Sequence, residues 1–111
     1  MFNVAVMAST NGTDFQAMIE EKNVGRLTAH LACLITNKAD CGAVAKARAA
    51  GIPVHFVDPA SQSREAYDAE VMRALEPYAI DLIVLVGYMR IIGPEMVERY
   101  RGRILNVHPS L

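Results

Sequence analysis

The chain has 111 residues, of which 52% are apolar and 21% are charged, and its net charge at pH 7 is −1. This composition is that of an ordinary globular protein, and the length suits one domain rather than two. The 11 Lys and Arg residues are scattered along the sequence, which argues against a nucleic-acid interface or a basic membrane-binding face. An anionic ligand would therefore have to be held locally, by a few groups.

Neither the start of the chain nor its two cysteines indicates secretion. Residues 1–9 lack a basic segment, and their apolar stretch is too short for a signal peptide or a membrane span. Cys33 and Cys41 have neither the spacing of a zinc or redox motif nor the density of a disulfide framework. Cys33 lies in an apolar run that predicts a core position. We therefore expect a cytoplasmic protein without a metal site.

Residues 3–8 form a short apolar run, which predicts a buried strand. The turn-prone sequence Ser-Thr-Asn-Gly over residues 9–12 follows, so the strand is expected to end in a loop. A helix is predicted next, because Thr13 and Asp14 are both good N-cap residues and an apolar face follows them at helical spacing. That face consists of Phe15, Met18 and Ile19.

The same order of strand and helix is predicted to repeat. A second apolar strand covers residues 30–35, and an alanine-rich helix is expected to open at Asp40 and to stop at Gly51. Residues 53–57 come next, and Ser63 is predicted to cap a third helix. The apolar face of that helix carries Tyr67, Val71, Ala74, Leu75 and Tyr78.

The last part of the chain continues the alternation. Residues 81–86 are the most β-rich run and predict a central strand. Pro94 suits the first turn of a short helix through Tyr100, and residues 103–107 predict a fifth strand. Strands that alternate with helices imply right-handed crossovers. The sequence therefore predicts an α/β fold with a Rossmann-like, mostly parallel sheet and helices on both faces.

Ligands of such sheets bind at the carboxyl ends of the strands, where three segments carry unusual chemistry. The first, residues 9–14, places backbone N–H groups and a helix N-terminus directly after a strand, which favours a phosphate. It is neither a dinucleotide fingerprint nor a Walker loop, so an ordinary turn would look similar. The second, residues 87–92, sets Arg90 beside apolar side chains. It would suit a flat ligand that carries an acid, or it is a plain loop with a solvated arginine.

The third segment is the most informative. Asn106 and His108 lie two residues apart on a predicted strand and therefore point to the same side of the sheet. Pro109 keeps His108 extended, because a residue before proline avoids the helical region. The Asn106 amide could stabilise an oxyanion, and the imidazole could exchange a proton near neutral pH. The alternative is a histidine at a strand end that makes a structural hydrogen bond.

Five stretches of the sequence carry distinctive motifs. They are residues 9–16 (STNGTDFQ), 36–40 (TNKAD), 63–68 (SREAYD), 87–91 (GYMRI) and 105–111 (LNVHPSL). In their order and spacing they resemble the phosphoribosylglycinamide formyltransferase family, and the resemblance covers essentially the whole chain. The asparagine-x-histidine-proline-serine motif indicates folate-dependent formyltransferases as a class, while the Asn-Gly loop and the TNKAD segment indicate the purine enzymes within it.

The resemblance implies a specific reaction in purine synthesis, transfer of a formyl group from 10-formyltetrahydrofolate as co-substrate to the amine of glycinamide ribonucleotide. By matching position, Asn106 would hydrogen-bond the formyl oxygen and His108 would assist charge stabilisation and proton transfer. The nucleotide phosphate would be held by backbone N–H groups of Asn11, Gly12, Thr13 and Asp14. The folate pocket would be lined by Met89, Arg90, Ile91 and Ile92, with Arg64 and Arg90 near the acidic tail of the folate.

The sequence departs from the family pattern at two loop positions and at its end. Thr10 stands where the family has glycine, and Asp14 stands where it has asparagine; the carboxylate would repel a phosphate unless it turned to cap the helix. The family continues beyond Leu111 to a catalytic aspartate. The resemblance therefore implies that residues 1–111 are the N-terminal, phosphate-binding part of a formyltransferase domain, truncated after the Asn-x-His-Pro-Ser motif.

Other functions remain open at this point. The chain could be another folate-dependent formyltransferase, a formyltetrahydrofolate hydrolase or a non-catalytic ligand-binding fragment. Its expected partners are small-molecule substrates, with no nucleic acid or membrane. A homo-oligomer or a complementary C-terminal half would cover the surface that a truncated sheet exposes.

Overall fold

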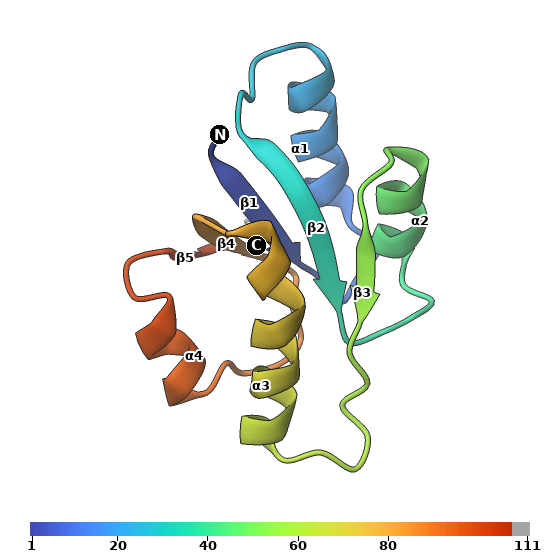
Figure 1. The fold of residues 1–111 in the computed structure, drawn as a ribbon. Helices are drawn as coiled ribbons and strands as arrows, with labels where there is room; N and C mark the ends of the chain where they lie inside the picture. Colours follow the sequence, from blue (N-terminus) through green and yellow to red (C-terminus); the bar gives the residue numbers. More distant parts are fainter. Residues whose placement is uncertain (108–111) are drawn as a thin grey trace.

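The computed structural model describes residues 1–107 of the chain, and strands alternate with helices throughout this part (Figure 1). A 3₁₀ turn over Glu76–Tyr78 follows the third helix. The strands are β1 (Asn3–Met7), β2 (His30–Thr36), β3 (Val54–Phe56), β4 (Leu82–Val86) and β5 (Ile104–Val107). The helices are α1 (Thr13–Asn23), α2 (Gly42–Ala49), α3 (Arg64–Leu75) and α4 (Pro94–Arg99).

All five strands are parallel and form one sheet in the order β3-β2-β1-β4-β5. From β1 the chain first builds the sheet outward through β2 and β3, then crosses back to β4 on the other side of β1. The strand order therefore reverses between β1 and β4, the place where ligands of open α/β sheets bind. The predicted Rossmann-like sheet is confirmed. The predicted central strand, β4, is an interior strand between β1 and β5.

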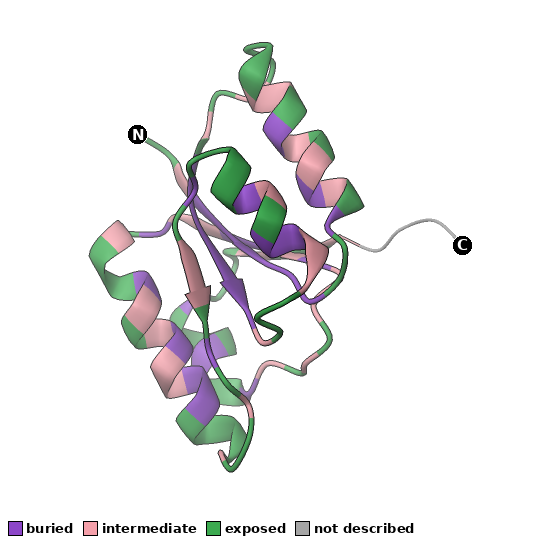
Figure 2. Ribbon diagram, turned by 90° about the vertical axis from the view of Figure 1, so that its right-hand side faces the viewer, coloured by how far each residue is buried: buried purple, intermediate pink, exposed green. Residues whose placement is uncertain are grey.

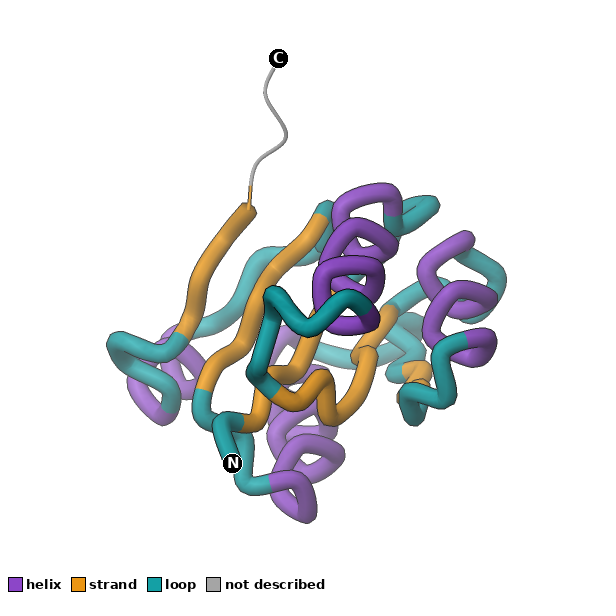
Figure 3. The backbone as a smooth tube through the Cα atoms, turned by 90° about the horizontal axis from the view of Figure 1, so that it is seen from above, coloured by secondary structure: helices purple, strands orange, loops and turns teal. Residues whose placement is uncertain are grey.

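Helices cover both faces of the sheet, as the view from above in Figure 3 shows. Val4 and Val6 of β1 pack in a cluster with α1 and α2, whereas Ala5 and Met7 pack in a second cluster with α3 and α4. Buried residues accordingly occupy the strands and the inward sides of the helices (Figure 2). Because both faces are covered, the inner strands are apolar throughout rather than alternating.

Several local predictions are confirmed. Ser63 caps α3, since its Oγ accepts the Ala66 N–H at 3.1 Å. Cys33 is fully buried, and this burial raises the pKa of its thiol to about 12. The predicted apolar face of α3 lies in the core, but Tyr78 belongs to the 3₁₀ turn, because Pro77 lacks the N–H that a continuing helix needs.

The predicted starts of α1 and α2 were wrong. Gly12, not Thr13 or Asp14, is the N-cap of α1, and no side chain caps this helix. Gly12 adopts a left-handed φ of 79° and packs so closely on α2 that an added Cβ would lie 2.9 Å from Ala43 Cα. Likewise Cys41, not Asp40, caps α2, because a turn that bonds Cys41 N–H to the Lys38 carbonyl comes before it. A contact beyond the local sequence sets the start of α1, whereas a local turn sets the start of α2.

Candidate functional site

The loops after β1 and β4 meet where the strand order reverses. Ser9, which directly follows β1, is 3% exposed, and its N–H donates to the Gly87 carbonyl at 3.2 Å. Its hydroxyl donates to Asn37 Oδ1 at 2.6 Å and accepts the Met89 N–H at 2.9 Å. One buried hydroxyl thus joins the loops after β1, β2 and β4. Sequence reasoning included Ser9 in a loop but gave it no role.

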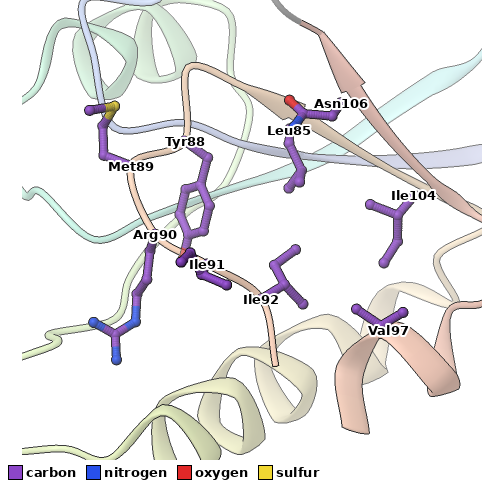
Figure 4. Close-up of a pocket in the computed structure, with 9 residues that line it drawn as sticks. All are labelled: Leu85, Tyr88, Met89, Arg90, Ile91, Ile92, Val97, Ile104 and Asn106. Carbon is purple, nitrogen blue, oxygen red and sulfur yellow. The ribbon is translucent and has the colours of Figure 1, made fainter. Parts of the chain in front are cut away.

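A mostly apolar pocket of about 630 Å³ lies beside the loop after β4 (Figure 4). It brings Asn106 of β5 together with all four loop residues predicted to line a folate site. Asn106 is exposed at the rim, with the apolar side chains below it. The lining residues are Leu85, Tyr88, Met89, Arg90, Ile91, Ile92, Val97, Ile104 and Asn106. His108 lies outside the described residues.

Two buried side chains of α3 hold the pocket loop from behind. The Tyr67 and Tyr88 hydroxyls are 2.7 Å apart, and Asp68 Oδ2 accepts the Gly93 N–H at 2.7 Å. Burial raises the pKa of both tyrosines, so the pair stays protonated at neutral pH. The loop is therefore fixed at its start by Tyr67 and at its end by Asp68.

The two arginines predicted to meet an acidic ligand lie beside this loop's contacts with α3, Arg90 over Tyr67 and Arg64 beside Gly93. The guanidinium carbon of Arg90 is 4.1 Å from the centre of the Tyr67 ring, a cation–π contact. Arg90 Nε is buried and has no hydrogen-bond partner within residues 1–107. Arg64 does not line the pocket, but its Cδ would lie 3.0 Å from a Cβ added at Gly93. The Arg90 guanidinium is therefore held against Tyr67, with its Nε shielded from solvent.

A second, smaller pocket of about 260 Å³ contains the four residues predicted to hold a phosphate. In the part of the chain that the structure describes, the backbone N–H groups of Asn11 to Asp14 bond to no protein acceptor. Thr10 also lines this pocket and lies against Gly87 without closing it. Asp14 lines the pocket without capping the helix, contrary to the prediction, so its carboxylate adds negative charge there.

Sequence reasoning missed two residues of α2 that contact the phosphate-pocket loop. Lys46 Nζ donates to the Asn11 carbonyl at 2.6 Å. A Cβ at Gly42 would lie 2.7 Å from the same carbonyl oxygen. The available signal was a glycine in the first turn of a predicted helix, where it costs about 1 kcal/mol, with a lysine four residues later on the same face.

Comparison with known proteins identifies the family. The model of the formyl transferase family matches residues 2–111. The chain belongs to this family. It is 42% identical to phosphoribosylglycinamide formyltransferase of Escherichia coli over 98% of its own length and 52% of the relative. It is 38% identical to the trifunctional purine biosynthetic protein adenosine-3 of Gallus gallus, over 97% of the chain and 11% of that protein.

A solved structure of the family has the same fold. Glycinamide ribonucleotide transformylase 1 from Geobacillus kaustophilus superposes with a TM-score of 0.95 at 38% identity, over 100% of this chain and 60% of the relative. The chain thus spans about half the length of the Escherichia coli relative. Within residues 1–107 no cluster of three metal-ligating side chains exists, and no described helix is long and apolar enough to cross a membrane.

Proposed function

We propose that this chain takes part in the transfer of a formyl group from 10-formyltetrahydrofolate to the amine of glycinamide ribonucleotide, in purine synthesis. The observation that carries the proposal is a pair of pockets that both border the carboxyl end of β4, one through Val86 and Gly87 and the other through Leu85 and Tyr88. One is lined by a loop whose backbone N–H groups have no acceptor within residues 1–107, and the other is apolar with an exposed amide in its lining. A phosphorylated acceptor and a flat folate need these two environments side by side.

In the proposed arrangement, the phosphate binds the N–H groups of Asn11, Gly12, Thr13 and Asp14 at the start of α1. The folate ring lies against the apolar side chains of Met89, Ile91 and Ile92. The guanidinium group of Arg90 would meet the acidic tail, and Arg64, whose side chain lies beside Gly93, adds a second positive charge near the loop.

The chemistry itself is an acyl transfer. The acceptor amine attacks the formyl carbon, and the carbonyl oxygen gains negative charge that the Asn106 amide would stabilise by hydrogen bonding. The nitrogen–carbon bond to the folate then breaks. The amine loses a proton and the folate nitrogen gains one, and we propose His108 as the group that assists this exchange. Residues 1–111 would then form the N-terminal part of a formyltransferase domain.

A turnover assay tests the proposal. The chain is incubated with both substrates, and formylated nucleotide and released formate are measured separately. Nucleotide formylation supports the proposal, while formate release that does not depend on the nucleotide would indicate a hydrolase. In the described part of the chain no carboxylate lines the apolar pocket. We therefore expect residues 1–111 alone to bind both substrates but to transfer slowly.

A further inference from the structure

The loop between β1 and α1 packs on α2 through backbone rather than side chains. An added Cβ at Gly42 would lie 2.7 Å from the Asn11 carbonyl oxygen and 2.8 Å from Asn11 Cα. An added Cβ at Gly12 would lie 2.9 Å from Ala43 Cα. Contacts this short leave no room for a side chain at Gly42 or at Gly12. The first turn of α2 therefore acts as a rigid support for the loop.

Two hydrogen bonds from α2 set the direction of two successive peptide groups. The Ala43 N–H donates to the Thr10 carbonyl at 3.2 Å, and Lys46 Nζ donates to the Asn11 carbonyl at 2.6 Å. The C=O and N–H bonds of a planar trans peptide point in opposite directions. With both carbonyls held toward α2, the N–H groups of Asn11 and Gly12 point away from it. No residue of α2 lines the phosphate pocket, which opens on a side that α2 does not cover.

We propose that Lys46 is a positioning residue of the phosphate site, which fixes the Asn11–Gly12 peptide so that the Gly12 N–H donates to the bound anion. The inference rests on the proposed function, because it assumes that the loop N–H groups hold the phosphate of the acceptor. Lys46 acts through the peptide, and its ammonium group does not need to touch the ligand.

The charge of Lys46 strengthens this role in two ways. An ammonium group bonded to a carbonyl polarises the peptide and makes the N–H at its other end a stronger donor. Neither of the two ion pairs found within residues 1–107 involves Lys46, so its charge is not neutralised there by a carboxylate. The positive charge of Lys46 also offsets the negative charge of the Asp14 carboxylate, which lines the phosphate pocket. A solvated surface lysine without a bond to the loop would not polarise this peptide group and would not offset the charge of Asp14.

The test compares three variants of the chain. Lys46→Met keeps the length of the side chain but removes the donor and the charge. Lys46→Arg restores both. Lys22→Met removes the same charge from the last turn of α1, at the far end of that helix from the loop. For each variant, residual dipolar couplings of the Asn11 and Gly12 amides are measured by NMR without ligand. Inorganic phosphate and glycinamide ribonucleotide are then titrated.

Lys46→Met should reduce the residual dipolar coupling of the Gly12 amide. The Gly12 N–H belongs to the same peptide group as the Asn11 carbonyl, which Lys46 no longer holds in this variant. The Asn11 coupling should stay as in the wild type, since Ala43 holds its peptide. Affinity for both phosphate compounds should fall roughly tenfold, about the value of one charge-assisted hydrogen bond, and Lys46→Arg should recover most of it. Lys22→Met should leave couplings and affinities unchanged.

An unchanged Gly12 coupling in Lys46→Met would overturn the inference, as would an equal loss of affinity in Lys22→Met. The results distinguish a wrong acceptor from a wrong role of Lys46. If the wild-type chain binds no phosphate compound while the Gly12 coupling still responds to Lys46, the proposed acceptor is wrong and Lys46 only shapes the loop. If the wild type and Lys46→Met bind the phosphate compounds equally well, the phosphate site is supported and the positioning role of Lys46 is wrong.

Discussion

The loops after β1 and β4 are neighbours in space but are built in opposite ways. The loop after β1 is held by its backbone, whose carbonyls bond to α2, and it presents backbone N–H groups to a small pocket. The loop after β4 is held by side chains, those of Ser9, Tyr67 and Asp68, and it presents apolar side chains to a larger pocket.

This difference predicts which substitutions each pocket tolerates. A pocket made of backbone depends on the residues that let chains approach, above all glycine, and little on the identity of its own side chains. A pocket made of side chains depends on the buried polar groups that hold its loop. Substitutions in the two loops should therefore have different effects on the two pockets.

The largest effect is expected for Asn106→Ala. Removal of the amide takes away a donor to the developing oxyanion, so the rate of formyl transfer should fall roughly 10²- to 10³-fold. The rate is measured in whichever form of the protein, these 111 residues or a longer chain, transfers formyl groups. Affinity for glycinamide ribonucleotide should remain within a factor of about two of the wild-type value. A rate that stays near the wild-type value would remove Asn106 from the mechanism.

Gly42→Ala should damage the phosphate pocket more than the apolar one. The new methyl group meets backbone atoms of Asn11, so the loop must shift, at a cost of about 1 to 3 kcal/mol in stability. Phosphate affinity should fall more than about tenfold, while folate affinity holds, as measured by calorimetric titration.

Gly51→Ala is the matched control for that substitution. Its φ of 72° makes alanine strained there, but nothing lies within 4 Å of the added methyl group. It should lower the unfolding temperature and leave phosphate affinity unchanged. If both variants weaken phosphate binding equally, then general instability, and not the position of the loop, explains the loss.

The sequence predicted the fold and the two loops because both depend on local patterns. Apolar runs, capping residues and turn residues are read within a few positions, as the confirmed cap at Ser63 shows. The predicted start of α2 was wrong because a turn from Lys38 to Cys41 comes before the helix. The predicted start of α1 was wrong because Gly12 meets Ala43, 31 positions away in the chain, and no local preference reports that contact. Ser9, Gly42, Lys46 and Asp68 were missed as site residues for the same reason.

Asp68→Ala should affect the apolar pocket alone. The substitution leaves the buried Gly93 N–H without its acceptor, at a cost of about 1 to 3 kcal/mol in unfolding free energy. The end of the loop should loosen and folate affinity should fall by up to about tenfold, while phosphate affinity stays unchanged. Asp68→Asn retains an acceptor oxygen and should recover part of the loss. A drop in phosphate affinity in Asp68→Ala would show that the two loops are not independent.

Ser9→Ala should affect both pockets modestly, because its hydroxyl bonds to the loops after β2 and β4 next to the phosphate loop. The loss leaves the Met89 N–H and the Asn37 side chain without this partner. We expect each affinity to fall a few-fold, within about 1 kcal/mol. Ser9→Thr, which keeps the hydroxyl, is the comparison variant. A loss confined to one ligand would mean that Ser9 belongs to that pocket only.

The smallest effect, and an increase, is expected for Asp14→Asn. The carboxylate lines the phosphate pocket without capping α1, so its removal should tighten phosphate binding by about twofold. The gain should shrink as the salt concentration rises, because exposed charges are screened. Weaker binding in Asp14→Asn would mean that the carboxylate contacts the amine end of the ligand rather than repelling its phosphate.

The central claim is that two neighbouring loops serve two different ligands, and amide NMR of the wild-type chain tests it most directly. Titration with glycinamide ribonucleotide should shift the amides of Asn11, Gly12 and Thr13, and titration with 10-formyltetrahydrofolate should shift those of residues 89–92. The second ligand should bind with the first in place. If both ligands shift the same set of amides and compete, the chain has one shared site, and the assignment of the two pockets to two substrates is wrong.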